Sequence, residues 1–381
     1  MKKVSVISII GVLVIGIISV LVYQGLQDNS SENSEALTAT LLEQKEANTE
    51  PKPFKTKAVI GGIGDILLHD TVYNDALTEN GYDFNPMFKP VHSILQKPDF
   101  LIANQESTPG GPEFGISSYP TFNSPFEIVD ALMEAGVDMV TTANNHSIDR
   151  RTPSLALLSA IEYYEKVGLP YTGTFKSEED RNTIRVMNVN GIKIAVLSYT
   201  YGLNGIPIPE GKDYVVNLLD RELILSDIEK AKPISDVVLL ALHWGNEYQR
   251  QPNQEQRQLA DEFIKAGADI IFGHHPHVLQ PMQWIEREDG SKGLVIYSLG
   301  NFLSGQIWDY KDIGGMIEVT LTKEIRNNET TISIEDPILH PTFSSSIQFA
   351  NYRVYPLDEA VEKGFTSLSS AEIREFFKEV K

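Results

Sequence analysis

The stretch DIIFGHHPHV, residues 269–278, places three histidines directly after a short apolar run rich in isoleucine. Ligands of open α/β sheets bind beyond the carboxyl ends of the strands, so a strand end of this kind is a natural place for a site. Four further polar clusters follow apolar runs in the same way: Gly64-Asp65, Asn104-Gln105-Glu106, Asn144-Asn145-His146 and His243-Trp244-Gly245. Because the chain has only eight histidines, this recurrence predicts that the five clusters together line a metal site.

Amphipathic segments alternate with these predicted strands. We expect helices at three places, each followed by a glycine: 126–135, 153–167 and 254–266. A strand–helix–strand rhythm is typical of an α/β fold. Towards the C-terminus, residues 316–322 and 330–335 alternate like antiparallel strands, and residues 369–381 predict a helix capped by serine.

The composition excludes several functional classes. The net charge of −20 argues against a nucleic-acid-binding protein, because such binding depends on basic patches. The chain has no cysteine, which excludes thiol catalysis, cysteine-ligated zinc and disulfide bonds. With 381 residues, of which 41% are hydrophobic, the chain is long and apolar enough for one large globular domain or two modest ones.

The N-terminus predicts attachment to a membrane. Residues 4–23 carry no charge and are long enough to span a hydrocarbon core as a helix. The preceding Lys2 and Lys3 favour an N-terminus inside the cell. We therefore expect an uncleaved, single-pass signal-anchor in the cell membrane, with the following domain extracytoplasmic. A cleaved signal peptide is the alternative.

Composition also suggests where the folded part begins and ends. Residues 24–55 are polar and include two prolines, which predicts a flexible linker after an anchor at residues 1–23. We assign residues 56–345 to the folded domain and residues 346–381 to a helical tail.

His275 and His277 are the strongest candidates for metal ligands. Proline pushes the residue before it into an extended conformation, and Pro276 lies between the two histidines. In an extended segment, side chains two residues apart share a face. We therefore predict that both imidazoles point into one site, while His274 points away from it.

Carboxylates and an amide complete the predicted ligand set. Asp65 and Glu106 each stand at the end of an apolar strand, Asn145 offers a neutral oxygen, and His243 offers a further imidazole. Such a mixture of ligands suits manganese, iron or zinc. A carboxylate that bridges two ions would match the two-metal arrangement used for displacement at phosphorus. If His146 is not itself a ligand, it could donate a proton to a leaving group.

Three other residues are candidates for substrate binding. Arg150 and Arg250 follow the clusters around His146 and His243, and a guanidinium pairs well with carboxylate or phosphate. Asn301 follows a predicted strand and could close the rim of the site. The role of Glu247, in the motif HWGNEY, stays open.

At these motifs the chain resembles the CapA family of capsule synthesis proteins, the poly-γ-glutamate group that includes PgsA-type proteins. The resemblance covers roughly residues 57–305. It rests on five motifs in order: GDI at 64–66, ANNHSID at 143–149, HWGNEY at 243–248, GADIIFGHHPHV at 267–278 and YSLGNF at 297–302. That family is similar in turn to the calcineurin-like metallophosphoesterases. This similarity implies a four-layer α/β/β/α sandwich with a dinuclear metal site.

The resemblance also implies which residues hold each of the two ions. The first ion would be held by Asp65, Glu106 and His277. The second ion would be held by Glu106, Asn145, His243 and His275. His146 would stand where the phosphoesterases keep their proton donor.

Two positions depart from the phosphoesterase pattern. The phosphoesterases usually carry a histidine two residues after the first aspartate, where this chain has Leu67; His69 could substitute if the loop turns. The bridging position is usually aspartate and here is Glu106. Phosphatase activity therefore does not carry over directly.

Functions from different classes stay open at this point. The first is a membrane-tethered, metal-dependent hydrolase or transferase that acts on an anionic envelope polymer or phosphoester during capsule or poly-γ-glutamate synthesis. The second is a non-catalytic anchor or export subunit of a membrane polymer synthase, and a third is a binding protein for an anionic ligand. The first predicts stoichiometric transition metal, and the second predicts function that survives loss of His146.

Overall fold

The computed structural model describes residues 53–149, 154–335, 337–366, 368–369 and 371–372. The predicted anchor and nearly all of the predicted linker lie outside these ranges, and so does Arg150. Within them, no helix is both long and apolar enough to cross a membrane. Contacts divide the chain into two units, and the fold described below is that of residues 55–324 and 330–381.

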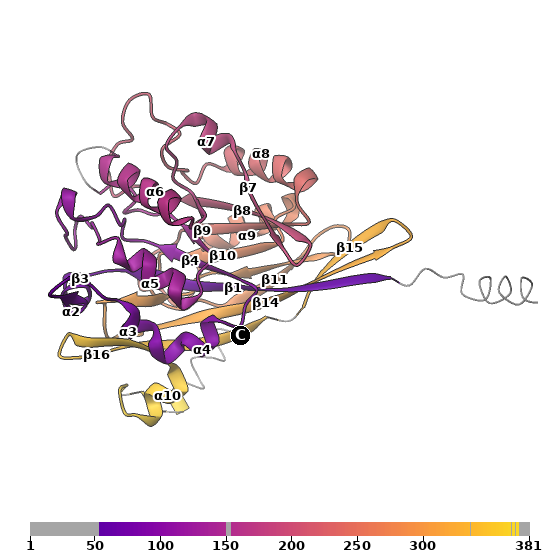
Figure 1. Cartoon of the computed structure of the whole chain (residues 1–381). Coiled ribbons are helices and arrows are strands. Elements are labelled where there is room, and N and C mark those ends of the chain that lie inside the picture. Colours follow the sequence, from indigo (N-terminus) through magenta and orange to yellow (C-terminus); the bar gives the residue numbers. More distant parts are fainter. Residues whose placement is uncertain (1–52, 150–153, 336, 367, 370, 373–381) are drawn as a thin grey trace, which may run out of the picture. The chain divides into compact units, whose positions relative to one another are not determined.

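The first sheet joins strands from both ends of the described chain (Figure 1). Its parallel part contains β1 (Phe54–Leu67), β4 (Phe100–Gln105), β5 (Met139–Thr141) and β6 (Tyr171–Thr172), and β13 (Asn301–Ser304) also pairs parallel to β1. Its antiparallel part contains β14 (Ile313–Arg326), β16 (Ile338–Ile347) and β17 (Ala350–Pro356), and β15 (Glu329–Ile334) pairs with β14. The strand order is β17-β16-β14-β1-β4-β5-β6.

The second sheet has the order β11-β12-β10-β9-β8-β7. Its inner strands run parallel: β12 (Lys292–Ile296), β10 (Ile270–His274), β9 (Val237–His243) and β8 (Ile192–Thr200). The edge strands β11 (Met282–Glu286) and β7 (Arg185–Val189) are antiparallel to their neighbours. A separate small hairpin pairs β2 (Leu77–Thr78) with β3 (Gly81–Tyr82).

The three helices that the sequence predicts between residues 126 and 266 are confirmed. They are α5 (Glu127–Ala135), α6 (Leu155–Val167) and α9 (Gln254–Ala266). A capping box starts α9, because Asn253 accepts from the backbone of Gln256 while the Gln256 side chain reaches back to the backbone of Asn253. The other helical segments are α2 (Asp70–Asp75), α3 (Asn85–Phe88), α4 (His92–Leu95), α7 (Glu178–Asn182), α8 (Arg221–Ala231) and α10 (Leu357–Glu362), with 3₁₀ turns at Lys89–Val91, Pro112–Phe114 and Lys232–Ile234.

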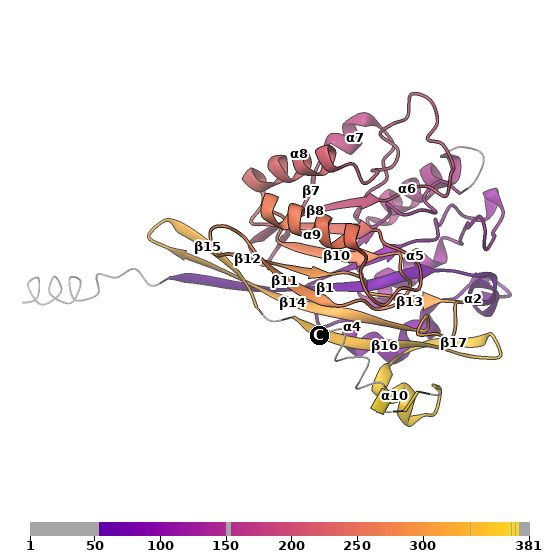
Figure 2. The ribbon, with the colours of Figure 1, turned by 180° about the vertical axis from the view of Figure 1, so that it is seen from behind.

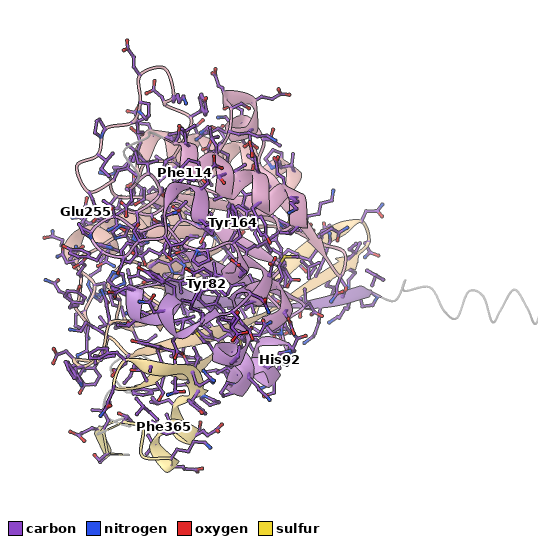
Figure 3. All side chains as sticks on the ribbon, turned by 60° about the vertical axis from the view of Figure 1, so that its left-hand side comes forward. Tyr82, His92, Phe114, Tyr164, Glu255 and Phe365 are labelled. Carbon is purple, nitrogen blue, oxygen red and sulfur yellow. The ribbon has the colours of Figure 1, made fainter. Side chains whose placement is uncertain are left out.

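Three apolar clusters set the layers, which Figure 2 shows from behind. One cluster lies between the two sheets and includes Ile60 of β1, Ile102 of β4 and Phe272 of β10. A second packs α5 and α6 on the outer face of the first sheet; it contains the buried Tyr164 of α6, labelled in Figure 3. A third packs α8 and α9 on the outer face of the second sheet, with Phe263 fully buried. The expected α/β class is confirmed.

The C-terminal segment differs from the prediction. We expected a helical tail from residue 346, but Ala350–Pro356 form the strand β17, and α10 follows it. Tyr352 and Val354 alternate with Arg353 and are buried, which is the pattern of a half-buried strand. The expected helix at 369–381 lies mostly outside the described residues.

The carboxyl ends of the parallel strands carry the predicted site residues. Asp65 of β1 pairs in register with Asn301 of β13, and His243 of β9 pairs with His274 of β10. The close approach at β1 requires glycine before Asp65, because a Cβ atom on Gly64 would lie 2.0 Å from the carbonyl oxygen of Gly300. Both sheets therefore deliver polar side chains to the same place.

Candidate metal centre

Asp65 is fully buried and bonded on both carboxylate oxygens. Asn104 donates its amide hydrogen to Oδ1 at 2.8 Å, and His274 Nδ1 lies 3.2 Å from the same oxygen. His277 Nδ1 lies 3.1 Å from Oδ2 and also 3.1 Å from Oδ1 of Asn301. Since both of these neighbours are acceptors, His277 carries its hydrogen on Nδ1. Nε2 is then the nitrogen that a metal ion could bind, once it has released any hydrogen it carries.

Glu106 sits at the middle of the cluster. It is 0% exposed, and neither of its carboxylate oxygens has a hydrogen-bond partner among the described residues. Its Oε1 lies 3.5 Å from Nε2 of His243 and 3.8 Å from Nε2 of His277. A buried carboxylate without partners is costly, and a metal ion is the usual way to satisfy it.

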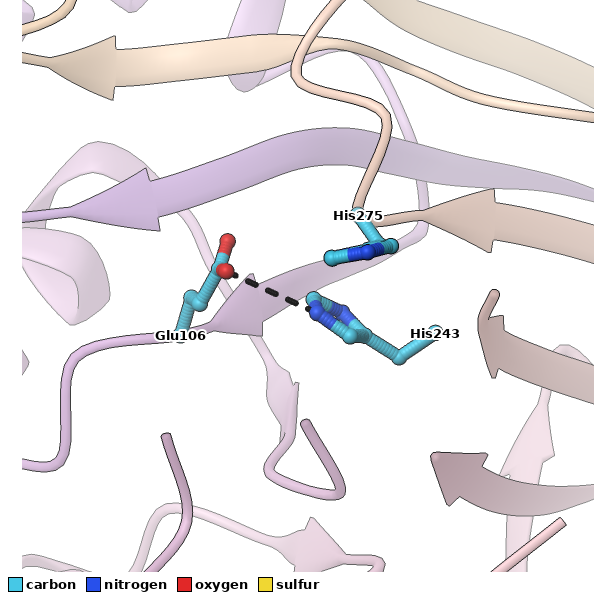
Figure 4. Close-up of side chains that lie close together, drawn as sticks. All are labelled: Glu106, His243 and His275. Carbon is cyan, nitrogen blue, oxygen red and sulfur yellow. Dashed lines mark ion pairs between the residues drawn. The ribbon is translucent and has the colours of Figure 1, made fainter. Parts of the chain in front are cut away.

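The predicted second-ion residues also converge on Glu106. Figure 4 shows Glu106, His243 and His275 facing one another, and their ligand atoms all lie within 4.8 Å of one another. Asn145 adds a neutral oxygen, because its Oδ1 lies 2.9 Å from Nε2 of His243. Tyr201 packs against His275, with ring centroids 4.5 Å apart and the ring planes tilted by 39°.

The first-ion residues also form a group of this kind. Asp65, Glu106 and His277 are all buried, and their ligand atoms lie within 4.8 Å of one another. Glu106 belongs to both groups, so the structure has two candidate ion positions with one shared carboxylate. A third group joins the exposed Glu247 to His275 and His277, which places this undecided residue at the rim of the centre.

The conformation of the GHHPH turn differs from the prediction. We expected an extended segment with His274 pointing away, but His274 contacts Asp65. The backbone explains the difference, because His275 and His277 have φ angles of 93° and 58°, in the left-handed region, so the side chains do not alternate as on a strand. Such conformations are sparsely populated outside glycine and concentrate at functional sites.

Burial and neighbouring charges shift the pKa values of the ionisable side chains of the centre in different directions. Burial lowers the pKa of His243 well below its ordinary value and that of His275 to about 3, so both are neutral imidazoles, the form that ligates metals. Burial alone would also lower the pKa of His277, but the charge of Glu106 and the hydrogen bond with Asp65 raise it to about 9. Burial raises the pKa of Glu106 well above its ordinary value. Metal binding would therefore have to release protons.

His146, the predicted proton donor, forms a dyad with Asp149. Its Nδ1 lies 2.7 Å from Oδ2 of Asp149, an oxygen that also accepts from the backbone N–H of Phe122 at 2.7 Å. The carboxylate therefore fixes a hydrogen on Nδ1 of His146. Asn204 lies between His146 and the metal cluster, because its Nδ2 is 3.4 Å from Nδ1 of His146 and its Oδ1 accepts from Asn145 at 3.3 Å.

The candidates for substrate binding lie in different places. Asn301 is buried, and its Nδ2 donates to Gln306 and to the carbonyl of Lys311 while its Oδ1 faces His277. This placement favours a positioning role, and substrate contact by Asn301 stays a prediction. Arg250 is half-buried, with its guanidinium 4.6 Å from the centroid of the Tyr310 ring. Arg150 is outside the described residues.

Leu67 and His69 do not join the ligand groups of the described residues. The phosphoesterase pattern has a further histidine where this chain has the buried Leu67, so the first-ion group lacks that ligand. His69 accepts on Nδ1 from the backbone N–H of Gly305 at 3.2 Å, which turns this nitrogen away from metal ligation.

Two contributors were not assigned from the sequence. Asp149 was visible as the end of ANNHSID, where an acid three residues after a histidine can reach its ring across a turn, but no role was given to it. Asn204 had no local signal, because it lies in a loop 58 residues further along the chain.

Comparison with known proteins gives a family. The family described as bacterial capsule synthesis protein PGA_cap matches residues 59–306. "Capsule biosynthesis protein CapA" of Bacillus anthracis is 29% identical over 305 residues, which cover 78% of this chain and 71% of the relative. "PGA biosynthesis protein CapA" of Bacillus subtilis (strain 168) is 31% identical over 297 residues, which cover 75% of this chain and 74% of the relative.

Two solved structures are also similar. The calcineurin-like phosphoesterase YfkN from Bacillus subtilis has 16% sequence identity and a TM-score of 0.45, with 85% of this chain and 98% of that chain covered. A putative 5'-nucleotidase from Staphylococcus aureus has 14% identity and a TM-score of 0.44; the match covers 85% of this chain but only 58% of the nucleotidase. On the family match across well over half of its length, and on its identity to the Bacillus subtilis relative, the chain belongs to the PGA_cap family of bacterial capsule synthesis proteins.

Proposed function

We propose that this protein is a metal-dependent hydrolase or transferase that acts on an anionic polymer or phosphoester of the cell envelope during capsule or poly-γ-glutamate synthesis. In this proposal the fold is a four-layer sandwich of the metallophosphoesterase type. Residues 4–23 anchor it in the cell membrane as a single span, with the metal centre outside the cytoplasm. Membrane subunits of a polymer synthase are the partners that such a location would offer.

The observation that carries the proposal is the environment of Glu106. A fully buried carboxylate, neither oxygen of which accepts a hydrogen bond from the described residues, belongs to two groups of nitrogen and oxygen ligands. A purely structural cluster would satisfy these atoms with hydrogen bonds from the protein. The donor set fits two divalent transition-metal ions, manganese, iron or zinc, with Glu106 between them.

The chemistry then divides between the ions and the chain. When bound, two divalent ions would supply the positive charge that a displacement at phosphorus or at a carbonyl requires. Asp65, Glu106 and Asn145 fix where that charge lies. Asp149 holds one hydrogen of His146 on Nδ1. When the ring is protonated it carries a second hydrogen on Nε2, which it can give to the leaving group.

Leu67 favours a second candidate function. Because an apolar side chain occupies the position of an expected ligand, the first-ion group has only Asp65, Glu106 and His277. A protein that has lost turnover could keep such a cluster as a structural or regulatory metal site. It would then serve as a non-catalytic anchor or export subunit of the synthase.

The variant His146→Ala separates these two functions. Removal of a general acid typically costs about 10²–10⁴ in rate. The full chain with manganese should hydrolyse bis(p-nitrophenyl) phosphate, and His146→Ala should lose most of this rate while it keeps its metal. A matched control is His92→Ala, since His92 lies in α4 and the ligand groups do not include it.

The same variant should also fail to support polymer production in cells. Normal polymer from cells that carry His146→Ala would defeat the enzymatic proposal and favour the anchor. Loss of metal together with the rate would show that His146 acts through the metal site rather than as a proton donor.

A further inference from the structure

A reciprocal pair of cation–aromatic contacts lies beside His277. Lys311 Nζ lies 5.1 Å from the centroid of the Tyr248 ring, and the guanidinium of Arg250 lies 4.6 Å from that of Tyr310. Two loops meet here, one after β9 and one between β13 and β14, and each contributes one cation and one ring. The Tyr248 ring centroid is 6.1 Å from that of His277, so this pair borders the metal centre.

Hydrogen bonds tie this pair to the first-ion residues. Asn301, which faces Nδ1 of His277, donates to the carbonyl oxygen of Lys311 at 2.8 Å and to Gln306 at 3.0 Å. Gln306 in turn donates to the hydroxyl of Tyr248 at 3.3 Å. The backbone N–H of Tyr248 donates to the carbonyl of Pro276 at 2.7 Å. These hydrogen bonds hold the backbone of Lys311 and that of Tyr248 close to His277.

The pair is also partly accessible to solvent. Tyr248 is 47% exposed, and the side chain of Lys311 is 22% exposed. The ion pair of Lys311 with Asp309 is long, at 3.6 Å, and Asp309 is 88% exposed, so this contact contributes little. A chain with a net charge of −20 repels anions in general, and an anionic substrate needs a local cation of this kind.

We infer that Lys311, with Tyr248 and the Arg250–Tyr310 pair, forms an anion-binding subsite at the mouth of the metal centre. It takes a carboxylate or phosphate group of the substrate beside His277 at the edge of the metal centre. As a substrate subsite it rests on the proposed function, but its affinity for an anion can be measured without turnover. A polycarboxylate and a polyphosphate would both fit this subsite, because each is a chain of regularly spaced anionic groups.

Calorimetric titration of the manganese-loaded full chain tests this subsite. The probes are pentaglutamate, a trimer of glycerol phosphate, and the neutral pentaglutamine. Loss of one charged contact should weaken binding of an anionic probe about tenfold in Lys311→Gln, which is close to 1.4 kcal/mol. Lys311→Arg should restore the affinity, and pentaglutamine should bind both proteins alike.

Lys363 provides the matched control. It also lies over a tyrosine, with Nζ 5.8 Å from the Tyr355 ring centroid, and it pairs with Glu359. Lys363→Gln should leave the affinity for both anionic probes unchanged. The tighter of the two anionic probes identifies the source of the anion as a polycarboxylate or a polyphosphate.

Equal affinity of the wild type and Lys311→Gln for both anionic probes would overturn the subsite, whatever the activity of the protein. An equal loss for pentaglutamine would overturn it too, because charge would not be the cause. Conversely, a protein without turnover that shows the Lys311-dependent binding would retain the subsite and lose the enzymatic proposal.

Discussion

Two buried polar clusters of this protein behave in opposite ways. Around Asp227 of α8 every charge is satisfied by the chain itself, because Arg181, Tyr199 and Lys230 all donate to its carboxylate at 2.6 to 3.2 Å. Around Glu106 the carboxylate has no hydrogen-bond partner among the described residues. In the first cluster the protein itself satisfies the carboxylate by hydrogen bonds. The second cluster brings together donor atoms that could hold a metal ion.

The pKa values of the two carboxylates follow the same contrast. Burial alone would raise the pKa of Asp227, but the hydrogen bond and charge of Arg181 hold it below the ordinary value. For Glu106, burial dominates and raises the pKa well above the ordinary value. Folding has therefore favoured ionisation at Asp227 and opposed it at Glu106.

The largest expected effect lies in the satisfied cluster. Asp227→Ala leaves the guanidinium of Arg181 buried without its partner, so we expect the free energy of unfolding to fall by about 3–5 kcal/mol. Chemical denaturation measures it. Asp261→Ala, which removes a half-exposed pair with Lys265, should cost well under about 1 kcal/mol. If the two variants lost equal amounts of unfolding free energy, the hydrogen bonds to Asp227 would not stabilise the fold more than an exposed ion pair does.

A smaller effect, on metal affinity, is expected at Asn301, which contacts the candidate metal ligand His277 through the nitrogen that does not bind the metal. Asn301→Ala removes the acceptor that faces Nδ1 of His277, and loss of such outer contacts typically lowers metal affinity about 10–100-fold. Competition against a fluorescent chelator measures the affinity. Asn246→Ala, which breaks an exposed contact with Gln249, should leave it unchanged. If Asn301→Ala binds metal as tightly as the wild type, His277 is held by Asp65 alone.

The smallest expected effect has the opposite sign. In the metal-free protein, Glu106→Met replaces a buried, unpartnered carboxyl with an apolar side chain of similar size. We expect the free energy of unfolding to stay the same or rise by about 1–3 kcal/mol. Added manganese should stabilise the wild type but not this variant. A loss of stability as large as that of Asp227→Ala would mean that Glu106 is satisfied within the fold.

The sequence predicted the positions of candidate site residues well where these residues lie at the end of a strand. Asp65, Glu106 and His243 follow from apolar runs with a polar end, because such a pattern fixes both the strand and the edge at which it ends. It failed at the turn after β10. The rule that an extended residue precedes proline did not hold at His275, whose φ of 93° brings His274 towards Asp65.

Contacts between distant loops had no signal in the sequence. Lys311 reaches Tyr248 only because β13 and β14 return beside the loop that follows β9, and Asn204 reaches His146 across 58 positions. Similarly, we did not recognise the strand β17 in a segment that we expected to be helical, since this strand has only seven residues. Pairing between remote segments is decided by the whole fold rather than by local pattern.

The manganese content of the full chain tests the central claim most directly, that Glu106 is shared by two ion positions. After equilibrium dialysis, elemental analysis should give about two ions per chain for the wild type, as two ligand groups imply. Glu106→Ala should lower occupancy at both positions, and His243→Ala should lose mainly one ion. A wild type that binds no metal, or a Glu106→Ala variant with unchanged content, would contradict the account.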